Sequence, residues 1–313
     1  MAGTGGLPLS DTDSLTLPAG TGWPAIAGAR QADAGARVPF HIIDGGRPWQ
    51  AGSVARAHLG ALARWQPALA VDSAGVTLHC PVPDRVQFLA EVNHRLRAEG
   101  LILAWRDEIY GVHALDGGHL LATIERAASR FWGTTTFGAH CNGYVAGAGG
   151  RPSHLWIARR AFTKPTDPGL LDNLVGGGVP HGQSPAACVV REGWEEAGLS
   201  PAQMAGLQPG RRLRVARDIP EGFQLEDVSA FDLALPPGLV PQNQDGEVHS
   251  ITLMPVADAL ACAAAGDMTV DASLVTLDFA LRHQLLGAAD AAALAARASH
   301  LWLGAARLDA DAP

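Results

Sequence analysis

The segment spanning residues 176–199 constrains the chain most, because it specifies a short helix with both ends defined. It reads GGGVPHGQSPAACVVREGWEEAGL. Ser184 is a favoured N-cap residue, and Pro185 suits the first helical position, where its missing N–H would have had no partner. Gly198 follows at a position where a left-handed backbone is common. The pattern predicts a glycine-rich turn that leads into a helix over residues 185–197.

Three glutamates on this helix are spaced unfavourably for an isolated helix. Glu192, Glu195 and Glu196 are separated by three and four residues, so their carboxylates share one face. Like charges at this spacing cost roughly 0.2–0.5 kcal/mol per pair, and carboxylates near a helix C-terminus cost roughly 0.3–1 kcal/mol each. Arg191 offsets only part of this. One interpretation is a solvated acidic face. The other is a group of hard oxygen ligands for Mg²⁺ or Mn²⁺, next to glycines that let a metal-bound phosphate approach the backbone.

The segment resembles the Nudix box, G-x5-E-x7-R-E-U-x-E-E-x-G-U, where U is a bulky aliphatic residue. The matching positions are Gly177, Arg191-Glu192, Glu195-Glu196 and Gly198-Leu199. Two positions depart from the box. Gln183 stands in place of a glutamate, although its side-chain oxygen can still accept a hydrogen bond. Gly193 stands in place of an aliphatic residue and should weaken the helix by roughly 1 kcal/mol relative to alanine.

Composition narrows the class of protein. The chain has 313 residues, 47% of them hydrophobic, which is ample for a buried core. A net charge of −8 argues against a nucleic-acid surface, because proteins that track phosphate backbones are usually basic. The four cysteines are far apart and predict buried thiols in a reducing compartment. No apolar run is long enough to span a membrane. We therefore expect a cytoplasmic protein without nucleic-acid or membrane partners, and a homodimer is left open.

The chain divides into four predicted regions. Residues 1–37 are rich in small and polar residues without apolar periodicity, and we expect a flexible arm. Residues 38–135 predict a small α+β companion domain, with a strand over 38–44, helices over 53–65 and 84–99, and two short strands. The apolar stripe of the second helix is Val86, Leu89, Val92 and Leu96, and we expect it to lie on a sheet. Residues 136–287 alternate strands and helices, which favours an α/β/α sandwich with a mixed sheet. Residues 288–313 predict an alanine-rich terminal helix or tail. The predicted fold class is α/β, a Nudix sandwich behind a companion domain.

The resemblance extends beyond the box to about residues 38–286. The companion domain carries Leu103-Ala-Trp-Arg-Asp-Glu-Ile-Tyr110 and Ile124-Glu-Arg-Ala127, and the second half carries Asn142-Gly-Tyr144, Trp156, Leu171-Asp-Asn173 and Asn243-Gln-Asp-Gly-Glu-Val248. These segments are similar to a Nudix subfamily that includes plant and fungal hydrolases of damaged thiamine diphosphate and the front half of fungal thiamine pyrophosphokinases. The resemblance implies Mg²⁺-dependent hydrolysis of a diphosphate bond in a small organic diphosphate, giving a monophosphate and phosphate.

The resemblance also assigns catalytic and metal-binding residues. It implies that Glu192, Glu195 and Glu196 bind the metal, with the Gly177 carbonyl as a further ligand, and that Arg191 holds the carboxylates in place. Glu247 is a candidate fourth acid, as base or ligand, and its alternative is a solvated glutamate in a turn. Mg²⁺ or Mn²⁺ would neutralise the diphosphate and lower the pKa of a bound water.

Candidate substrate-binding residues follow from charge and shape. Arg160 and Lys164 are candidates to bind the phosphates, with the backbone of Gly177 and Gly178 close by. Arg159 and Arg160 point to opposite faces if they lie on a strand, so at most one of them is expected to serve. Trp105 is a candidate to stack on a heteroaromatic ring, where a thiazolium would gain roughly 0.5–2 kcal/mol of cation–π energy. Large aromatic residues more often belong to a core.

Three other functions remain as alternatives. Isopentenyl diphosphate isomerases share the fold but use a cysteine just before the box, where this chain has Asn173-Leu174-Val175-Gly176. A non-catalytic Nudix sensor that binds a diphosphate is the second alternative; retention of the three helix glutamates favours turnover, while Gln183 leaves the matter open. A hydrolase of broad range on nucleoside diphosphate derivatives is the third.

Overall fold

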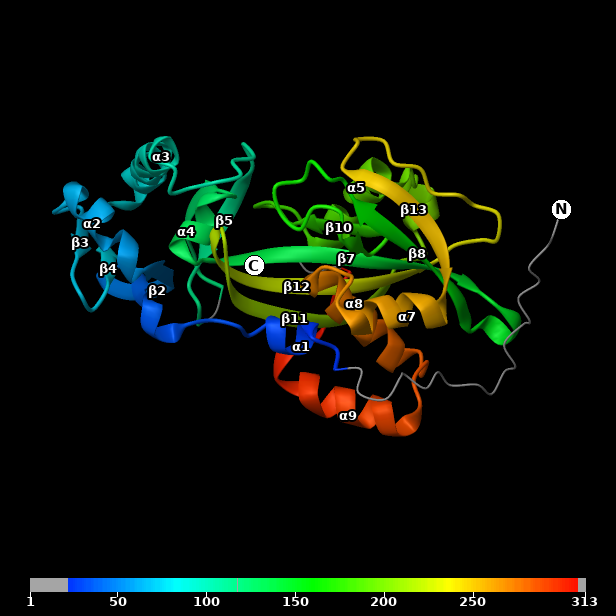
Figure 1. The fold of residues 1–313 in the computed structure, drawn as a ribbon. Helices are drawn as coiled ribbons and strands as arrows, with labels where there is room; N and C mark the ends of the chain where they lie inside the picture. Colours follow the sequence, from blue (N-terminus) through cyan, green and yellow to red (C-terminus); the bar gives the residue numbers. More distant parts are fainter. Residues whose placement is uncertain (1–21, 117, 309–313) are drawn as a thin grey trace.

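The computed structural model describes residues 22–116 and 118–308. The first 21 residues of the predicted arm lie outside this range. The described chain forms two units side by side (Figure 1), a companion domain from the N-terminal third and a larger domain around an eight-stranded sheet.

The companion domain is built on a four-stranded sheet in the order β2-β1-β4-β3. Its strands are β1 (Arg37–Asp44), β2 (Arg47–Ala55), β3 (Leu69–Val71) and β4 (Val76–Leu78). Helix α3 (Val82–Ala98) buries Leu89, Val92 and Leu96 in the same core as the sheet. A hairpin of β5 (Ile109–His113) and β6 (Leu120–Glu125), followed by α4 (Ala128–Trp132), completes the domain next to the larger sheet.

Two predictions for the companion domain are wrong. The predicted helix over 53–65 begins with the end of β2, and only α2 (Leu59–Leu62) is α-helical, between the 3₁₀ turns η2 (Arg56–His58) and η3 (Ala63–Trp65). Residues 53–55 are extended because they pair with β1. Val86, expected on the buried stripe of α3, is 48% exposed, and Arg85 is buried in its place. The Arg85 guanidinium donates to the Ile43 and Leu121 carbonyls and so joins the helix to both sheets.

The larger domain has a mixed sheet with the path β13-β8-β7-β12-β11-β14, where β10 also pairs with β7 and β9 with β8. Strands β7 and β12 run parallel, and the other pairs are antiparallel. The strands are β7 (Thr135–Ala146), β8 (Pro152–Arg160), β9 (Leu171–Asp172), β10 (Val175–Gly178), β11 (Gln208–Ile219), β12 (Gly222–Ala234), β13 (Val248–Pro255) and β14 (Trp302–Ala305).

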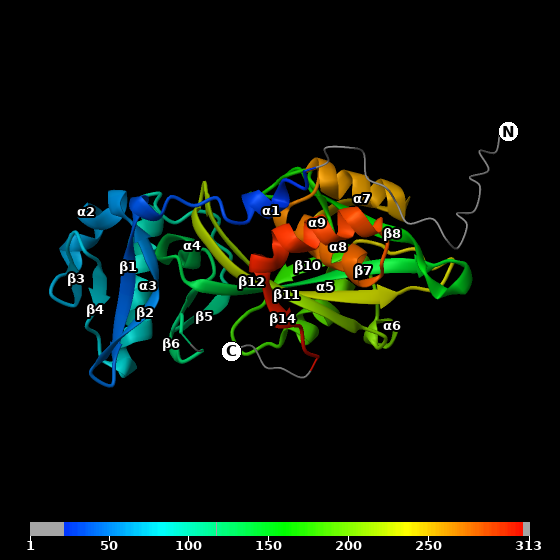
Figure 2. The ribbon, with the colours of Figure 1, turned by 90° about the horizontal axis from the view of Figure 1, so that it is seen from below.

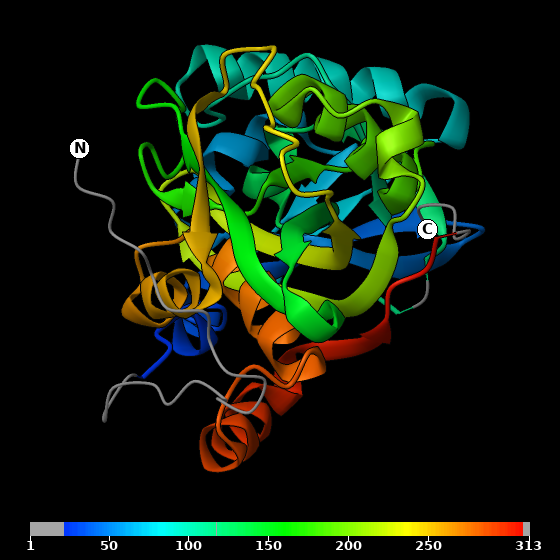
Figure 3. The same ribbon diagram turned by 90° about the vertical axis from the view of Figure 1, so that its right-hand side faces the viewer.

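Helices cover both faces of this sheet. Helices α5 (Pro185–Ala197) and α6 (Pro201–Met204) lie on one face, above the sheet in Figure 1. Helices α7 (Val256–Ala265), α8 (Val270–Arg282) and α9 (Ala288–Ala298) lie on the other, as Figure 2 shows from below. Figure 3 shows the strongly curved sheet between the two layers. The predicted α/β/α sandwich behind an α+β domain is confirmed.

Both ends of the described chain belong to the larger domain, which corrects the expected flexible arm and adds a strand after the expected alanine-rich helix, α9. Within the predicted flexible arm, Trp23 is fully buried and donates from its indole Nε1 to the Ser273 carbonyl, and α1 (Ala25–Gly28) packs against α8. A 3₁₀ turn, η1 (Ala34–Ala36), then leads into β1. At the other end, the chain continues beyond α9 through η5 (Ser299–Leu301) into β14, which pairs with β11 at the sheet edge. Both segments are ordered by burial against the sheet, which local sequence does not reveal.

The sheet opens beside its central strand. β8 pairs with residues 143–146 of β7, and β10 pairs with residues 138–141 of the same edge. Beyond this point β8 no longer pairs with β7 and pairs with β9 instead, while it keeps its pairing with β13. The glycines of β10 therefore lie at a split in the sheet, where side chains from both domains can reach them.

Candidate active site

The three glycines of the box begin the site, and each lets another element come close. A Cβ on Gly176 would lie 2.8 Å from the His140 ring, one on Gly177 would collide with the Glu192 carboxylate, and one on Gly178 would collide with the Tyr110 hydroxyl. These residues form strand β10 rather than the predicted turn, because they pair with β7. The glycine run is needed for close approach from the sheet, the helix and the companion domain.

Helix α5 confirms the predicted bounds. It runs over Pro185–Ala197, Ser184 accepts a hydrogen bond from the Ala187 N–H, and Gly198 ends it in the left-handed conformation with φ of 65°. Cys188 and Val189 bury its inner face, and the Cys188 thiol donates to the Gly178 carbonyl at 3.2 Å. The helix thereby presents its acidic last turns to β10.

The three glutamates have different surroundings. Glu196 is buried, and its Oε2 accepts from the Gly176 N–H at 2.8 Å. Arg191 donates to Glu192 Oε1 at 2.8 Å and to Glu195 Oε2 at 2.7 Å. Glu195 is the most exposed of the three, with 39% of its side chain accessible. Arg191 therefore holds two glutamates, and the backbone of β10 holds the third.

Two of these carboxylates lose more hydration on folding than the neighbouring positive charges and hydrogen bonds replace. Burial raises the pKa of Glu192 to about 7, against the attraction of Arg191 and with added repulsion from Glu195. Burial raises the pKa of Glu196 to about 8, because Lys164 and the Gly176 N–H offset only part of the desolvation. A pair of buried acids with raised pKa values is typical of a functional site.

The carboxylates of this helix are suitable ligands for a divalent metal ion, although the three glutamates are not gathered into the predicted metal site. Within residues 22–116 and 118–308, no three acidic, histidine or cysteine side chains are gathered closely enough to hold a metal ion. The physical reason is that Arg191 draws Glu192 and Glu195 to itself, while Glu196 is held at β10. Glu192 and Glu196 remain buried hard-oxygen donors whose charge a divalent cation would compensate. The missing side chain of Gly177 leaves the room that Glu192 fills beside the strand.

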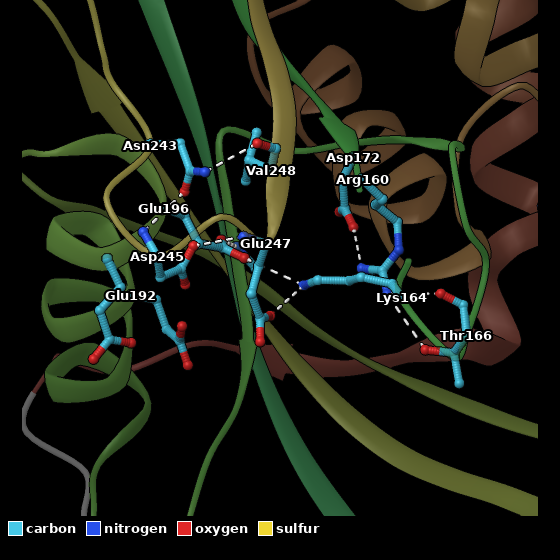
Figure 4. Close-up of polar contacts among 12 residues, drawn as sticks. Arg160, Lys164, Thr166, Asp172, Glu192, Glu196, Asn243, Asp245, Glu247 and Val248 are labelled. Carbon is cyan, nitrogen blue, oxygen red and sulfur yellow. Dashed lines mark hydrogen bonds and ion pairs between the residues drawn. The ribbon is translucent and has the colours of Figure 1, made fainter. Parts of the chain in front are cut away.

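Lys164 and Glu247 form an ion pair beside Glu196 (Figure 4). The Lys164 Nζ lies 2.5 Å from Glu247 Oε2 and 3.8 Å from Glu196 Oε1, and only 11% of the lysine side chain is exposed. Burial would raise the pKa of Glu247, but the hydrogen bond and charge of Lys164 outweigh it and hold that pKa below its ordinary value. Glu247 is therefore ionised and paired, on the loop just before β13, and Arg106 of the companion domain lies 3.7 Å from its other oxygen.

Arg160 reaches the site but is largely occupied by protein groups. Its guanidinium donates to Asp172 Oδ2 at 2.9 Å and to the Thr166 and Asp167 carbonyls, so it ties the loop over 161–170 to β9. Arg159, on the opposite face of β8, donates to the Gly169 carbonyl instead. Arg160 faces the cavities of the site and Arg159 does not.

A cavity of about 400 Å³ lies between the two domains, and many of these side chains line it, although Arg159 and Glu196 do not. Its cationic side chains are Arg106, Arg126, Arg160, Lys164 and Arg191, and its acids include Glu192, Glu195 and Glu247. Arg126, at the end of the companion hairpin, donates to Glu108 Oε2 at 2.8 Å and stands over the Tyr110 ring. Sequence reasoning assigned no function to Arg106 or Arg126. The only signal was their place in segments that resemble the companion domain of the subfamily.

Two predicted residues lie elsewhere. Trp105 does not line the cavity: it stacks on His94 with ring centroids 4.9 Å apart, Arg97 covers it, and it packs against the companion core. The predicted contact of Trp105 with a substrate is therefore corrected to a packing contact. Gln183 stands just before α5, and its Oε1 is buried without a hydrogen-bond partner among the described residues. It does not reach Arg191 by a hydrogen bond.

Comparison with protein families decides the identity of the two domains. The NUDIX domain family matches residues 142–274, and a domain of unknown function, DUF4743, matches residues 29–136. The chain carries a Nudix domain behind a DUF4743 domain. The predicted resemblance to a Nudix domain preceded by a companion domain is thereby confirmed. The DUF4743 domain is the one that brings Arg106 and Arg126 to the Nudix site.

Individual relatives agree with this assignment. Nudix hydrolase 20, chloroplastic, of Arabidopsis thaliana is 38% identical over 206 residues, which cover 64% of this chain and 53% of that protein. Nudix hydrolase 24, chloroplastic, of the same plant is 38% identical over 205 residues, covering 65% and 55%. The chain thus spans about half the length of these curated relatives. A solved structure from Deinococcus radiodurans covers 55% of this chain and 99% of its own, with 19% identity and a TM-score of 0.43.

The comparisons leave the predicted cytoplasmic location as a prediction, since both plant relatives are described as chloroplastic. Among the described helices, none has the length and apolar character needed to cross a membrane.

Proposed function

We propose that this protein is a Nudix hydrolase that uses Mg²⁺ or Mn²⁺ to cleave the diphosphate bond of a small organic diphosphate. The observation that carries the proposal is the pair of glutamates at the glycine strand, the buried Glu196 and the partly buried Glu192, whose raised pKa values mark negative charge that the protein does not fully compensate. Around them stand cationic side chains from both domains, suited to an anionic substrate.

The residues would act as follows. Glu192 and Glu196 would hold the cation, with Glu195 as a third acid on the same helix face. When bound, the cation neutralises phosphate oxygens and lowers the pKa of a bound water. Arg191 positions Glu192 and Glu195 through its two hydrogen bonds. Arg126 and Arg106 would bind the phosphates from the companion side, where an arginine fork matches two oxygens.

Lys164 and Glu247 would contribute a switchable pair of charges. In the structure each neutralises the other, so Glu247 is not free to act as a base. An incoming diphosphate would compete for Lys164, and Glu247 would then accept a proton or bind the cation. Glu247 therefore stays a candidate for the fourth acid.

We propose thiamine diphosphate or its oxidised analogues as the substrate class, on the subfamily resemblance of the companion domain and box. The test measures release of the hydrolysis products with Mg²⁺ and with EDTA: inorganic phosphate from thiamine diphosphate, oxothiamine diphosphate and ADP, and AMP with ribose 5-phosphate from ADP-ribose. We expect Mg²⁺-dependent release, fastest from the thiamine compounds, and loss of release in Glu196→Gln. The matched control is Glu91→Gln, which changes an exposed glutamate of α3.

The other outcomes separate the alternatives. Faster turnover of the ADP compounds would favour a nucleoside diphosphate hydrolase of broad range and refute the thiamine assignment. Binding of a diphosphate without release of phosphate, in the wild type with Mg²⁺, would refute catalysis and favour a Nudix sensor. Full activity of Glu196→Gln would remove the metal assignment.

A further inference from the structure

Glu125 of the companion domain is a buried acid to which the proposed function gives no role. It is the last residue of β6, and only 7% of it is exposed. It directly precedes Arg126, which lines the cavity between the domains. A buried carboxylate requires hydrogen-bond donors or positive charge, so its partners indicate what it does.

The Glu125 carboxylate joins two backbone segments of the companion domain. Its Oε1 accepts from the Arg106 N–H at 2.7 Å, and its Oε2 accepts from the Ala127 N–H at 2.6 Å. Arg106 lies 19 residues before Glu125, on the connection between α3 and β5. One carboxylate therefore fixes the backbone at both arginines that the companion domain brings to the site, at Arg106 itself and immediately after Arg126.

The backbone around Arg106 requires such support. Ala104 and Asp107, on either side of it, have φ of 57° and 59°, in the left-handed region that residues other than glycine rarely adopt. Trp105 holds this loop at one point, because it packs against the companion core and its Nε1 donates to Asp107 Oδ1 at 2.7 Å. Glu125 holds it at another. Unfavourable backbone of this kind persists only where the surrounding structure fixes it.

From these fixed points both arginine side chains reach the Nudix domain. Arg106 Nη1 lies 3.7 Å from Glu247 Oε1, and a Cβ on Gly178 would lie 3.0 Å from Arg126 Cζ. Hydrogen bonds weaken steeply outside a narrow range of distance and angle, so a small displacement of the backbone would cost a guanidinium its contact with a phosphate. The position of the two backbone segments therefore decides whether both arginines can bind one diphosphate.

A purely local role explains only one of the two bonds of Glu125. The Ala127 N–H lies at the start of α4, where a donor lacks a partner within the helix, so its bond would stabilise α4 whatever the arginines do. The bond to the Arg106 N–H connects a different part of the chain and does nothing for α4. A residue that only capped α4 would need one oxygen, and Glu125 uses both.

We propose that Glu125 is a positioning residue for the hydrolysis, whose carboxylate holds Arg106 and Arg126 where both can bind one diphosphate. The inference rests on the proposed function for the role of the two arginines as phosphate ligands. Glu125 itself bonds neither phosphate nor metal and acts through the backbone of its neighbours. The companion domain thereby supplies a preorganised pair of cations, which lowers the entropic cost of binding the substrate.

The test measures the affinity for methylenediphosphonate by calorimetry in Mg²⁺. This diphosphate analogue has a P–C–P bridge that water does not cleave, so its binding does not depend on catalysis. Glu125→Gln keeps the shape of the side chain and one acceptor oxygen, but places an N–H₂ group against the second backbone N–H. We expect binding to become about tenfold weaker. The direction is informative, because removal of a negative charge near an anion should strengthen binding if Glu125 acted by its charge alone.

A double-mutant cycle tests whether Glu125 acts through the arginines. Arg106→Ala removes the guanidinium and keeps the backbone N–H that Glu125 holds. In this background Glu125→Gln should weaken binding by no more than about threefold, because only Arg126 is left to be displaced. An equal loss of affinity in both backgrounds would show that Glu125 supports the fold alone, and would overturn the proposal.

Asn93→Ala is the matched control for a loss of stability in the companion domain. Asn93 is buried in α3, and its Oδ1 accepts from the Trp132 Nε1 at 2.8 Å. The variant should lower Tm, measured by circular dichroism, and leave the affinity within about twofold. If Glu125→Gln does not fold, Glu125→Asp takes its place, because it keeps the charge but is too short to reach both N–H groups. The same loss of affinity and the same dependence on Arg106 are expected.

The outcomes separate this proposal from the proposed function. Unchanged or tighter binding in the Glu125 variant overturns the positioning role, even if phosphate release is normal. A wild type that does not bind methylenediphosphonate overturns it as well. Binding that depends on Glu125 and is coupled to Arg106, in a protein that releases no phosphate under Mg²⁺, supports the positioning of the arginines and overturns only the hydrolase.

Discussion

Replacing Glu196 by glutamine should stabilise the metal-free protein while it abolishes activity. Glu196 is buried at β10, and its pKa lies at about 8 in the folded protein, against an ordinary value of 4.5. Because the folded pKa is the higher one, ionisation opposes folding, beginning above the unfolded pKa and growing until the folded pKa is reached. Each pH unit in that window contributes about 1.36 kcal/mol, so the ionisable side chain opposes folding by about 3 kcal/mol at pH 7.

Glutamine removes this cost and keeps most local contacts. Its Oε1 can still accept from the Gly176 N–H, and Lys164 keeps its ion pair with Glu247. The variant should therefore gain little stability at pH 4.5 and about 3 kcal/mol at pH 7, with a further gain up to pH 8. In a chain of this size the gain at pH 7 raises Tm by several degrees.

The assay is urea denaturation in EDTA at pH 4.5, 7 and 8, followed by circular dichroism, for the wild type, Glu196→Gln and the exposed-site control Glu91→Gln. The control should show no gain that depends on pH. A variant that is less stable than the wild type at pH 8, or a difference that does not change with pH, would refute the reasoning that Glu196 is an uncompensated buried acid.

Four further predictions concern the surroundings of the site. Gly178→Ala should lower the free energy of unfolding by about 1–3 kcal/mol in urea denaturation, because the new Cβ would meet the Tyr110 hydroxyl. The control Gly60→Ala, whose Cβ would meet no other atom, should be neutral or stabilising. Equal effects of the two variants would contradict the close approach of Tyr110 to Gly178. Tyr110→Phe should leave stability unchanged or raise it by up to about 1 kcal/mol, since the buried hydroxyl has no partner among the described residues; a loss above that size would reveal a bond to it. Trp105→Ala should lower Tm without changing KM, measured by phosphate release, and a raised KM would restore its contact with substrate. Trp23→Ala should cost about 3–5 kcal/mol in denaturation, and a change near zero would return this segment to a flexible arm.

Local sequence was sufficient for the helix at the centre of the site. Ser184 and Pro185 define the start of α5 and Gly198 defines its end, because caps act on backbone groups of the adjacent turn. The spacing of Glu192 and Glu196 on that helix likewise follows from the helical period. The same local reasoning predicted alternating strands and helices over residues 136–287, and with them the α/β/α class.

Local reasoning was wrong where a segment pairs with a strand from elsewhere in the chain. The residues over 53–55 were expected to be helical but pair with β1, and the glycines of β10 were expected to turn but pair with β7. Backbone hydrogen bonds in a sheet come from distant segments, so the propensity of a short stretch does not determine whether it becomes a strand.

The sequence by itself determined one capped helix, its acidic face and the family that this pattern indicates. Tertiary structure alone brought Arg106 and Arg126 of the companion domain to the Nudix sheet. It also decided that Trp105 packs into a core. The physical reason is range: caps and helical spacing act over a few residues, whereas a cavity between domains depends on contacts between residues that are far apart in the chain.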